Sequence, residues 1–316
     1  MSETSFEGVL PALVTPFTPD GAAVDHEALG ALVERCVAAG AGGLVPCGST
    51  GEFPTLSSAE RRAVVETTIA TAAGRAPTVA GTGALSTRET IELSVHAEQA
   101  GAAAVMIVPP FYDPLSWPEL LAHYADVAEA ISIPIMYYNL PSATGQTLTA
   151  AQLQKLRREA GVTSLKDTGG DATAATELIQ REGEGPTLLN GYDTQTFSAL
   201  AQGVRAVVWG VASILPEPCV RLHRLLIDDL DLAAARDLWQ RLWPVCDFVE
   251  RHSYPAAVKA GCELVGLTTG PVRAPLRPLG AGAREELAQR IAANRTIPPI
   301  VGTEWGGTLR EPRALA

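Results

Sequence analysis

The sequence is poor in positive charge: 24 lysines and arginines stand against 35 aspartates and glutamates, a formal net charge of −11. Nucleic acids and anionic membranes are bound mainly through basic patches, so this balance argues against both as partners. Cysteine and histidine are also sparse, with five of each. The cysteines form no CxxC pair and the histidines no HxH or HExxH spacing. Neither a disulfide framework nor a metal site is therefore predicted.

Long apolar runs are absent as well, since no stretch reaches the roughly 18 residues that span a bilayer. The N-terminal "MSETSFEG" lacks the charged and apolar regions of a signal peptide. Hydrophobic residues make up 47% of the chain, which supplies an ordinary globular core. We expect a cytoplasmic protein without a metal, large enough for one barrel-sized domain and a smaller appendage.

One local pattern recurs along the chain: a helix-like stretch, a glycine, and a short run of small and β-branched residues. Glycine suits the position just past a helix end, and the buried run that follows is strand-like. The pattern occurs in "CVAAGAGGLVPCG" (36–48), "AEQAGAAAVMIVPP" (97–110), "REAGVTSLKD" (158–167) and "LAQGVRAVVWG" (200–210). Helices over 58–73 and 87–100 are predicted to start at serine or threonine caps, followed by Glu60 and Glu89.

The strand candidates number about eight, and each is followed by a helix candidate. They are residues 9–15, 43–47, 77–81, 104–108, 133–138, 162–167, 186–190 and 205–209. Strands without polar alternation that alternate with helices indicate a parallel sheet covered on its outer face. Eight such units favour an α/β fold of the closed (β/α)8 TIM-barrel type over an open doubly wound sheet.

The strand signal stops after residue 230, and helices are predicted over 232–250, 254–266 and 282–293. We therefore divide the chain into three parts. Residues 1–228 form a catalytic barrel, 229–295 a small C-terminal helical region, and 296–316 a tail rich in Pro, Gly and Thr.

Lys166 is the most unusual residue of the predicted barrel. It is one of three lysines in the chain and the only one inside an apolar strand, "GVTSLKD". Only about 0.04% of an ordinary lysine is neutral at pH 7, and burial favours the neutral, nucleophilic amine. Such an amine can condense with a ketone to an imine, which acts as an electron sink. The alternative is that Lys166 only pairs with a carboxylate such as Asp167.

Tyr138 ends the preceding strand and is expected beside Lys166 in the barrel mouth. A phenol there can pass protons during imine formation, although taken alone it is more often a core tyrosine. The loop "CGSTGE" (47–52) follows the second strand and offers the Ser49 and Thr50 hydroxyls with exposed backbone N–H groups. It can cradle a carboxylate. The alternative is a tight turn with a helix cap, and the loop is no nucleotide motif.

Taken together, "GSTGE", "YNLP…TG" and "LKDTGGD" resemble the dihydrodipicolinate synthase / N-acetylneuraminate lyase family of pyruvate-dependent class I aldolases. "PALVTPF" (11–17) and "YPAAVKAGCELVGL" (254–267) also match, and the resemblance covers roughly residues 6–295. It implies Lys166 as the Schiff-base lysine, Tyr138 as the proton-handling phenol, and Ser49 and Thr50 at the pyruvyl carboxylate and in a proton relay with that phenol. Tyr112 resembles a tyrosine that the family offers to this catalytic relay across a subunit interface, so a homo-oligomer, a dimer of dimers, is implied. No cofactor besides the lysine imine is implied.

Departures from the family pattern concern the second substrate. Where the lysine-pathway synthases carry an arginine that grips the aldehyde's carboxylate, this chain has Ala143. "NGYD", with Gly191 and Asp193, resembles the sialic acid lyases, but Thr194 replaces a glutamate that contacts the sugar there. Trp209 stands where the family more often has a small residue, and an indole is expected to shrink the pocket and make it more apolar.

The leading hypothesis is a class I lyase that makes or breaks a C–C bond between pyruvate, or another 2-oxo acid, and an aldehyde. The alternatives are a dihydrodipicolinate (4-hydroxy-tetrahydrodipicolinate) synthase, a 2-keto-3-deoxy acid dehydratase or deaminase, and a non-catalytic 2-oxo acid sensor.

Overall fold

The computed structural model describes residues 6–181 and 183–294. Seven strands in these ranges form one parallel sheet in the order β1-β7-β6-β5-β4-β3-β2. The strands are β1 (Gly8–Pro11), β2 (Val79–Gly81), β3 (Ala104–Ile107), β4 (Ile135–Asn139), β5 (Val162–Asp167), β6 (Thr187–Asn190) and β7 (Ala206–Trp209). The predicted α/β class with a parallel sheet is thereby confirmed.

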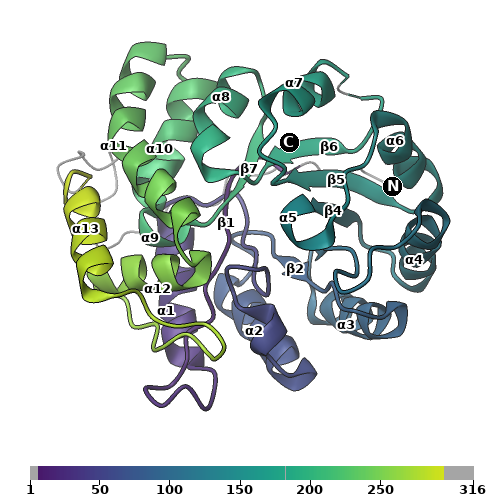
Figure 1. Cartoon of the computed structure of the whole chain (residues 1–316), viewed down its shortest axis with the longest axis horizontal. Coiled ribbons are helices and arrows are strands. Elements are labelled where there is room, and N and C mark those ends of the chain that lie inside the picture. Colours follow the sequence, from purple (N-terminus) through teal and green to yellow (C-terminus); the bar gives the residue numbers. More distant parts are fainter. Residues whose placement is uncertain (1–5, 182, 295–316) are drawn as a thin grey trace.

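Helices surround the curled sheet (Figure 1). Those that alternate with the strands are α1 (His26–Ala38), α2 (Ser58–Ala72), α3 (Thr87–Ala100), α4 (Trp117–Ala130), α5 (Pro141–Thr144), α6 (Ala150–Glu159), α7 (Ala172–Gln180), α8 (Thr196–Ala201), α9 (Val211–Ile214) and α10 (Pro216–Ile227), with the 3-10 turns η1 (Phe53–Thr55) and η2 (Asp193–Gln195). The chain continues into α11 (Leu232–Arg251), α12 (Tyr254–Leu264) and α13 (Ala281–Ala292), which lie together at one side of Figure 1. None of the helices in the described ranges is long and apolar enough to cross a membrane.

Residues 42–46 connect the two edges of the sheet. Ala12 pairs with Val45 and Leu44 with Thr78, both in parallel bridges. The Gly42 N–H also donates to the Val9 carbonyl (2.8 Å). The predicted strand 43–47 is therefore a pair of isolated bridges, and the first strand ends at Pro11 rather than at residue 15. The segment is too irregular for a full ladder, yet it joins β1 to β2.

The helix starts follow the predicted caps. Ser57 accepts from the Glu60 N–H, and Glu60 returns hydrogen bonds to Ser57, which completes a capping box at α2. Ser86 accepts from the Glu89 N–H at the start of α3. The predicted tail 296–316 lies outside the described residues.

Strand alternation separates two apolar layers. One cluster, inside the curl of the sheet, contains Met136, Tyr138 and Val208, whereas the larger cluster under the helices contains Tyr137 and Trp209. Because successive side chains of a strand point to opposite faces, residues beside each other in sequence enter different layers. This alternation decides which side chains reach the site.

Candidate active site

Tyr138 and Lys166 lie side by side on neighbouring strands. They are register partners in the β4–β5 pair, and each is only 5% exposed. The Lys166 Nζ lies 3.9 Å from the centroid of the Tyr138 ring. The structure thus brings together the two residues that sequence reasoning placed next to each other, near the carboxyl ends of their strands.

Asp167 does not serve as the partner of Lys166. Its Oδ1 accepts a hydrogen bond from Asn139 Nδ2 (2.6 Å) and another from the Gly169 N–H (3.0 Å). No carboxylate of the described residues forms an ion pair with Lys166. The simple ion-pair interpretation of this lysine therefore finds no support in its contacts.

Gly191 gives the Lys166 side chain its room. A Cβ at this position would lie 2.8 Å from both the Cγ and the Cε of Lys166 and 2.7 Å from Thr168 Cγ2. The Gly191 N–H donates to the Asp167 carbonyl (2.8 Å), which fixes the backbone at this approach. Because Gly191 has no side chain, the aliphatic part of the Lys166 side chain can lie directly against its backbone.

The loop 47–52 reaches toward Tyr138 from the segment that joins β1 to β2. Ser49 Oγ lies 3.4 Å from the Tyr138 hydroxyl, and Thr50 is buried. Within the described part of the chain, the N–H groups of Ser49 and Thr50 have no hydrogen-bond acceptor. Two free amides beside two hydroxyls can bind a carboxylate without any cationic side chain.

A small cleft lies between this loop and the inner layer. Its lining is mainly apolar and includes one face of Tyr138. The residues are Cys47, Gly48, Phe53, Gly81, Gly83, Met106, Val108 and Tyr138. The cleft has room for little more than one water molecule, and Lys166 is not among its lining residues.

Asp193 and Thr194 contact the C-terminal helices. Tyr254 donates its hydroxyl to both oxygens of the buried Asp193 carboxylate (2.9 Å each), and the Val211 N–H lies 3.4 Å from the same group. Thr194 donates its N–H (3.0 Å) and its hydroxyl (2.8 Å) to Glu250. These two predicted substrate contacts are thus engaged within the fold, and their role toward a substrate stays a prediction.

Asp193 should make stability depend on pH. Burial, followed by the negative charge of Glu250, raises the pKa of the Asp193 carboxyl to about 7. Between about pH 4 and pH 7 the folded state holds a proton that the unfolded chain has lost, so stability falls as pH rises. We expect Asp193→Asn to remove this decline, which is worth up to about 1.4 kcal/mol for each pH unit. Denaturant unfolding of both proteins at pH 5, 6, 7 and 8 measures it, and parallel curves would contradict it.

The remaining predicted pocket residues differ in exposure. Trp209 is 1% exposed and packs near Trp239 of α11, with ring centroids 6.3 Å apart. Because its neighbour Val208 belongs to the inner layer, the indole lies in the outer layer. This differs from the expectation that the indole narrows the pocket. Ala143, on α5, is exposed, and Tyr112 is 82% exposed.

Sequence reasoning missed a second buried lysine next to the loop. Lys259 of α12 lies 2.7 Å from Glu52, and both side chains are almost completely enclosed. The signal was present, because "AAVKAGC" places Lys259 among small apolar residues of a helix, where a charge is rare. Lys155, by contrast, lies half-exposed on α6 with Glu159.

A buried lysine and a tyrosine paired on adjacent parallel strands, beside a loop with free amides, are the arrangement expected of an imine-forming carbon–carbon lyase, and comparison with known proteins agrees with this class. The sequence profile of the Dihydrodipicolinate synthetase family matches residues 5–294. The chain therefore belongs to this family.

Several relatives match almost end to end. The 4-hydroxy-tetrahydrodipicolinate synthase of Sorangium cellulosum is 41% identical, over 93% of this chain and 99% of that protein. The synthase of the same name from Methanopyrus kandleri is 36% identical over 92% and 97%. Among solved structures, the dihydrodipicolinate synthase of Acinetobacter baumannii in complex with pyruvate is similar with a TM-score of 0.86 and 32% identity, over 92% of this chain and 99% of that one.

Proposed function

We propose that this chain is a pyruvate-dependent class I lyase in which Lys166 forms an imine with the 2-oxo acid. The register pair of Lys166 and Tyr138 carries the proposal, because it puts a buried amine against a phenol. The A. baumannii relative, which was solved with pyruvate, supports the choice of 2-oxo acid. The imine would supply the electron sink, with no metal or further cofactor.

The reaction would proceed in three stages. The Lys166 nitrogen adds to the C2 ketone of pyruvate, and the carbinolamine loses water to give the imine. A proton leaves C3, and the enamine carbon then bonds to the aldehyde carbon, whose oxygen takes up a proton. Water finally hydrolyses the product imine and releases Lys166. Tyr138, in reach of Ser49 Oγ, would pass the protons of the carbinolamine step.

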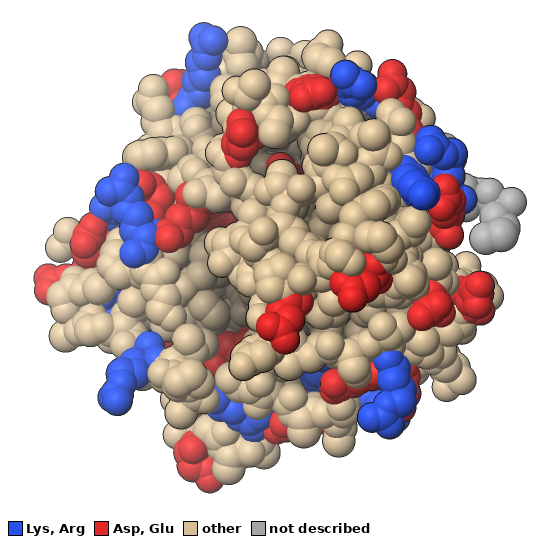
Figure 2. Space-filling model, turned by 45° about the vertical axis from the view of Figure 1, so that its right-hand side comes forward, with Lys and Arg blue, Asp and Glu red and all other residues tan. Residues whose placement is uncertain are grey.

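The carboxylate of pyruvate would bind at loop 47–52. The N–H groups of Ser49 and Thr50, which have no acceptor in the described residues, support this assignment. A 2-oxo acid must place its carboxylate next to the carbon that Lys166 attacks. On the face in Figure 2, lysine and arginine side chains form small scattered groups interspersed with acidic side chains, and no continuous basic patch. Backbone N–H groups can bind an anion without a cationic side chain.

For the aldehyde we propose aspartate semialdehyde first, because the curated relatives are named 4-hydroxy-tetrahydrodipicolinate synthase. The second candidate is an aldehyde without a distal carboxylate, which the exposed methyl group of Ala143 favours. The two candidates share every step at Lys166 and differ only in the partner of the enamine.

The test combines trapping with turnover. Borohydride added with pyruvate should reduce the imine to a stable pyruvyl adduct on Lys166, seen by mass spectrometry of the digested protein. Purified protein is then supplied with pyruvate and either aspartate semialdehyde or a panel of uncharged aldehydes. Turnover of the semialdehyde supports the synthase, turnover of uncharged aldehydes alone overturns it in favour of the second candidate, and a missing adduct overturns both.

The architecture around this site belongs to the same proposal. We infer that the sheet is a closed (β/α)8 barrel, because residues 42–46 hydrogen-bond to both of its edges. Residues 1–228 would form the barrel, and 229–295 the helical appendage. The exposed Tyr112 suggests a homotetramer in which this side chain reaches the site of a neighbouring subunit. A cytoplasmic location fits the free, buried cysteines.

A further inference from the structure

Loop 47–52 is bounded by two residues in a left-handed backbone conformation. Cys47 has a φ of 57° and Glu52 a φ of 56°, although neither is glycine. Such residues cost on the order of 1 kcal/mol each and persist only where surrounding contacts impose them. Thr15 provides one contact, because its hydroxyl donates to the Gly51 carbonyl (2.7 Å). The side chain of Glu52 provides further contacts.

Glu52 is buried and meets the C-terminal region with both carboxylate oxygens. Lys259 Nζ lies 2.7 Å from Oε1, and the Arg273 N–H donates to Oε2 (2.9 Å). Lys259 also donates to the Pro271 carbonyl (2.9 Å) and lies over the Phe17 ring. The loop is therefore held by α12 and by the segment after it, more than 200 residues away along the chain.

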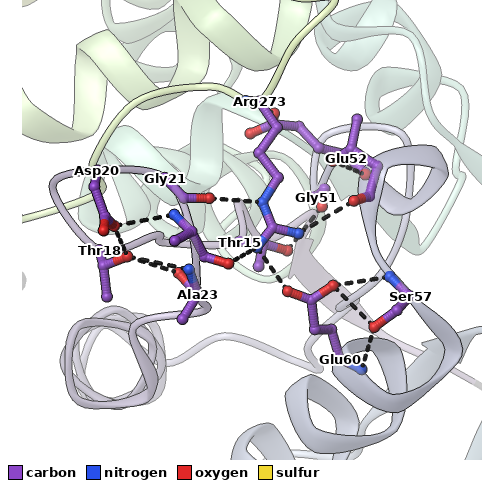
Figure 3. A network of polar contacts seen from close by, with 12 residues as sticks. Thr15, Thr18, Asp20, Gly21, Ala23, Gly51, Glu52, Ser57, Glu60 and Arg273 are labelled. Atoms are coloured by element: carbon purple, nitrogen blue, oxygen red, sulfur yellow. Dashed lines mark hydrogen bonds and ion pairs between the residues drawn. The ribbon is translucent and has the colours of Figure 1, made fainter.

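Arg273 extends this anchor to the elements on either side of the loop (Figure 3). Its guanidinium donates to the carbonyls of Gly21 (3.0 Å), Ala22 (3.0 Å) and Thr55 (3.1 Å). It also forms an ion pair with Glu60 at the start of α2 (2.6 Å). The turn before α1, the turn after the loop and the start of α2 are thus joined through one side chain, and the loop lies between them.

We propose that Glu52 is a positioning residue, which fixes the Ser49 and Thr50 amides at the carboxylate of the 2-oxo acid through its bonds to Lys259 and Arg273. This role rests on the proposed function of the loop. Buried ion pairs are weak evidence for stability, because the cost of removing two charges from water offsets their attraction. The strained backbone at Glu52 indicates another role for the ion pair with Lys259. The ion pair holds a short loop in a conformation that the loop would not keep alone.

The experiment compares pyruvate affinity with trapping capacity. In Glu52→Gln, the pyruvate concentration for half-maximal borohydride trapping should rise about tenfold or more, because small misplacements of binding groups have effects of this size. At saturating pyruvate the adduct on Lys166 should still form. Glu34→Gln is the control, because it removes a carboxylate from its ion pair with Arg75, which contacts neither the loop nor the residues that anchor it; its half-maximal concentration should stay within about twofold of wild type.

A second variant separates a loss of pyruvate affinity from a loss of folding stability. Glu52→Gln leaves the Lys259 ammonium unpaired, whereas Glu52→Gln with Lys259→Met removes both charges and should recover stability. The double variant should keep the weakened pyruvate affinity, since the amides are still unanchored. Wild-type affinity in a folded Glu52 variant, or recovery of affinity together with stability, would overturn the proposal. Failure of the wild-type protein to form any adduct would instead contradict the proposed function.

Discussion

Lys166→Ala should remove turnover completely, a loss of at least about 10⁴-fold, as is usual when a covalent nucleophile is deleted. Neither of the other two lysines can replace it, because Lys155 lies on the surface of α6 and Lys259 is bound to Glu52. The variant should fold with nearly unchanged or slightly higher stability, since it loses a buried amine that has no carboxylate partner in the described residues. Steady-state assays and denaturant unfolding measure the two effects.

Lys155→Ala is the matched control for this variant. It deletes the same side chain at a half-exposed position and should retain wild-type turnover and the pyruvyl adduct. A Lys166→Ala protein that still turns over pyruvate would remove the imine from the mechanism. Strong destabilisation of that variant would show that Lys166 acts mainly as a structural cation.

Tyr138→Phe should lower turnover by about 10²- to 10⁴-fold, the usual effect of losing a general acid–base group. The phenol lies beside the Lys166 amine and within 3.4 Å of Ser49 Oγ, so its removal interrupts proton transfer but leaves the nucleophile in place. The pyruvyl adduct should therefore still form under borohydride, only more slowly. The kcat and the rate of trapping, measured on the same preparation, separate these two effects.

Tyr137→Phe is a close control, because the two tyrosines are neighbours in β4. Tyr137 is 1% exposed, faces the outer layer beside Tyr124, and buries its hydroxyl without a hydrogen-bond partner in the described structure. Its removal should leave turnover unchanged and cost no stability. Equal losses in both variants would indicate that packing of β4, and not proton transfer, accounts for the effect of Tyr138.

Much of the fold could be predicted from local signals. The alternation of apolar runs with capped helices gave the parallel α/β class and the α2 and α3 starts at Ser57 and Ser86. The run at 43–47 was predicted as a strand but forms only bridges. Gly42 and Gly43 approach other backbone so closely here that a Cβ at either would meet it at 3.1 Å or less. Such close approach depends on the partners across the sheet.

The proximity of Lys166 and Tyr138 could be predicted from strand order alone, because adjacent parallel strands end together. Trp209 could not be placed, since one residue of offset decides whether a side chain enters the inner or the outer layer. The contact between Glu52 and Lys259 was missed because no local pattern links positions that far apart, although the apolar surroundings of Lys259 in its helix indicated burial.

The alternation of faces along β4 limits how this enzyme could change over evolutionary time. Insertion of one residue into β4 before Tyr137 would turn Tyr138 under the helices and present Tyr137 to the amine in its place. Point substitutions in the turns after the strands do not change which side chains of the strands face the inner layer. New substrate ranges are therefore accessible by changing those turns at constant strand length, while the spacing inside the strand itself must be inherited unchanged.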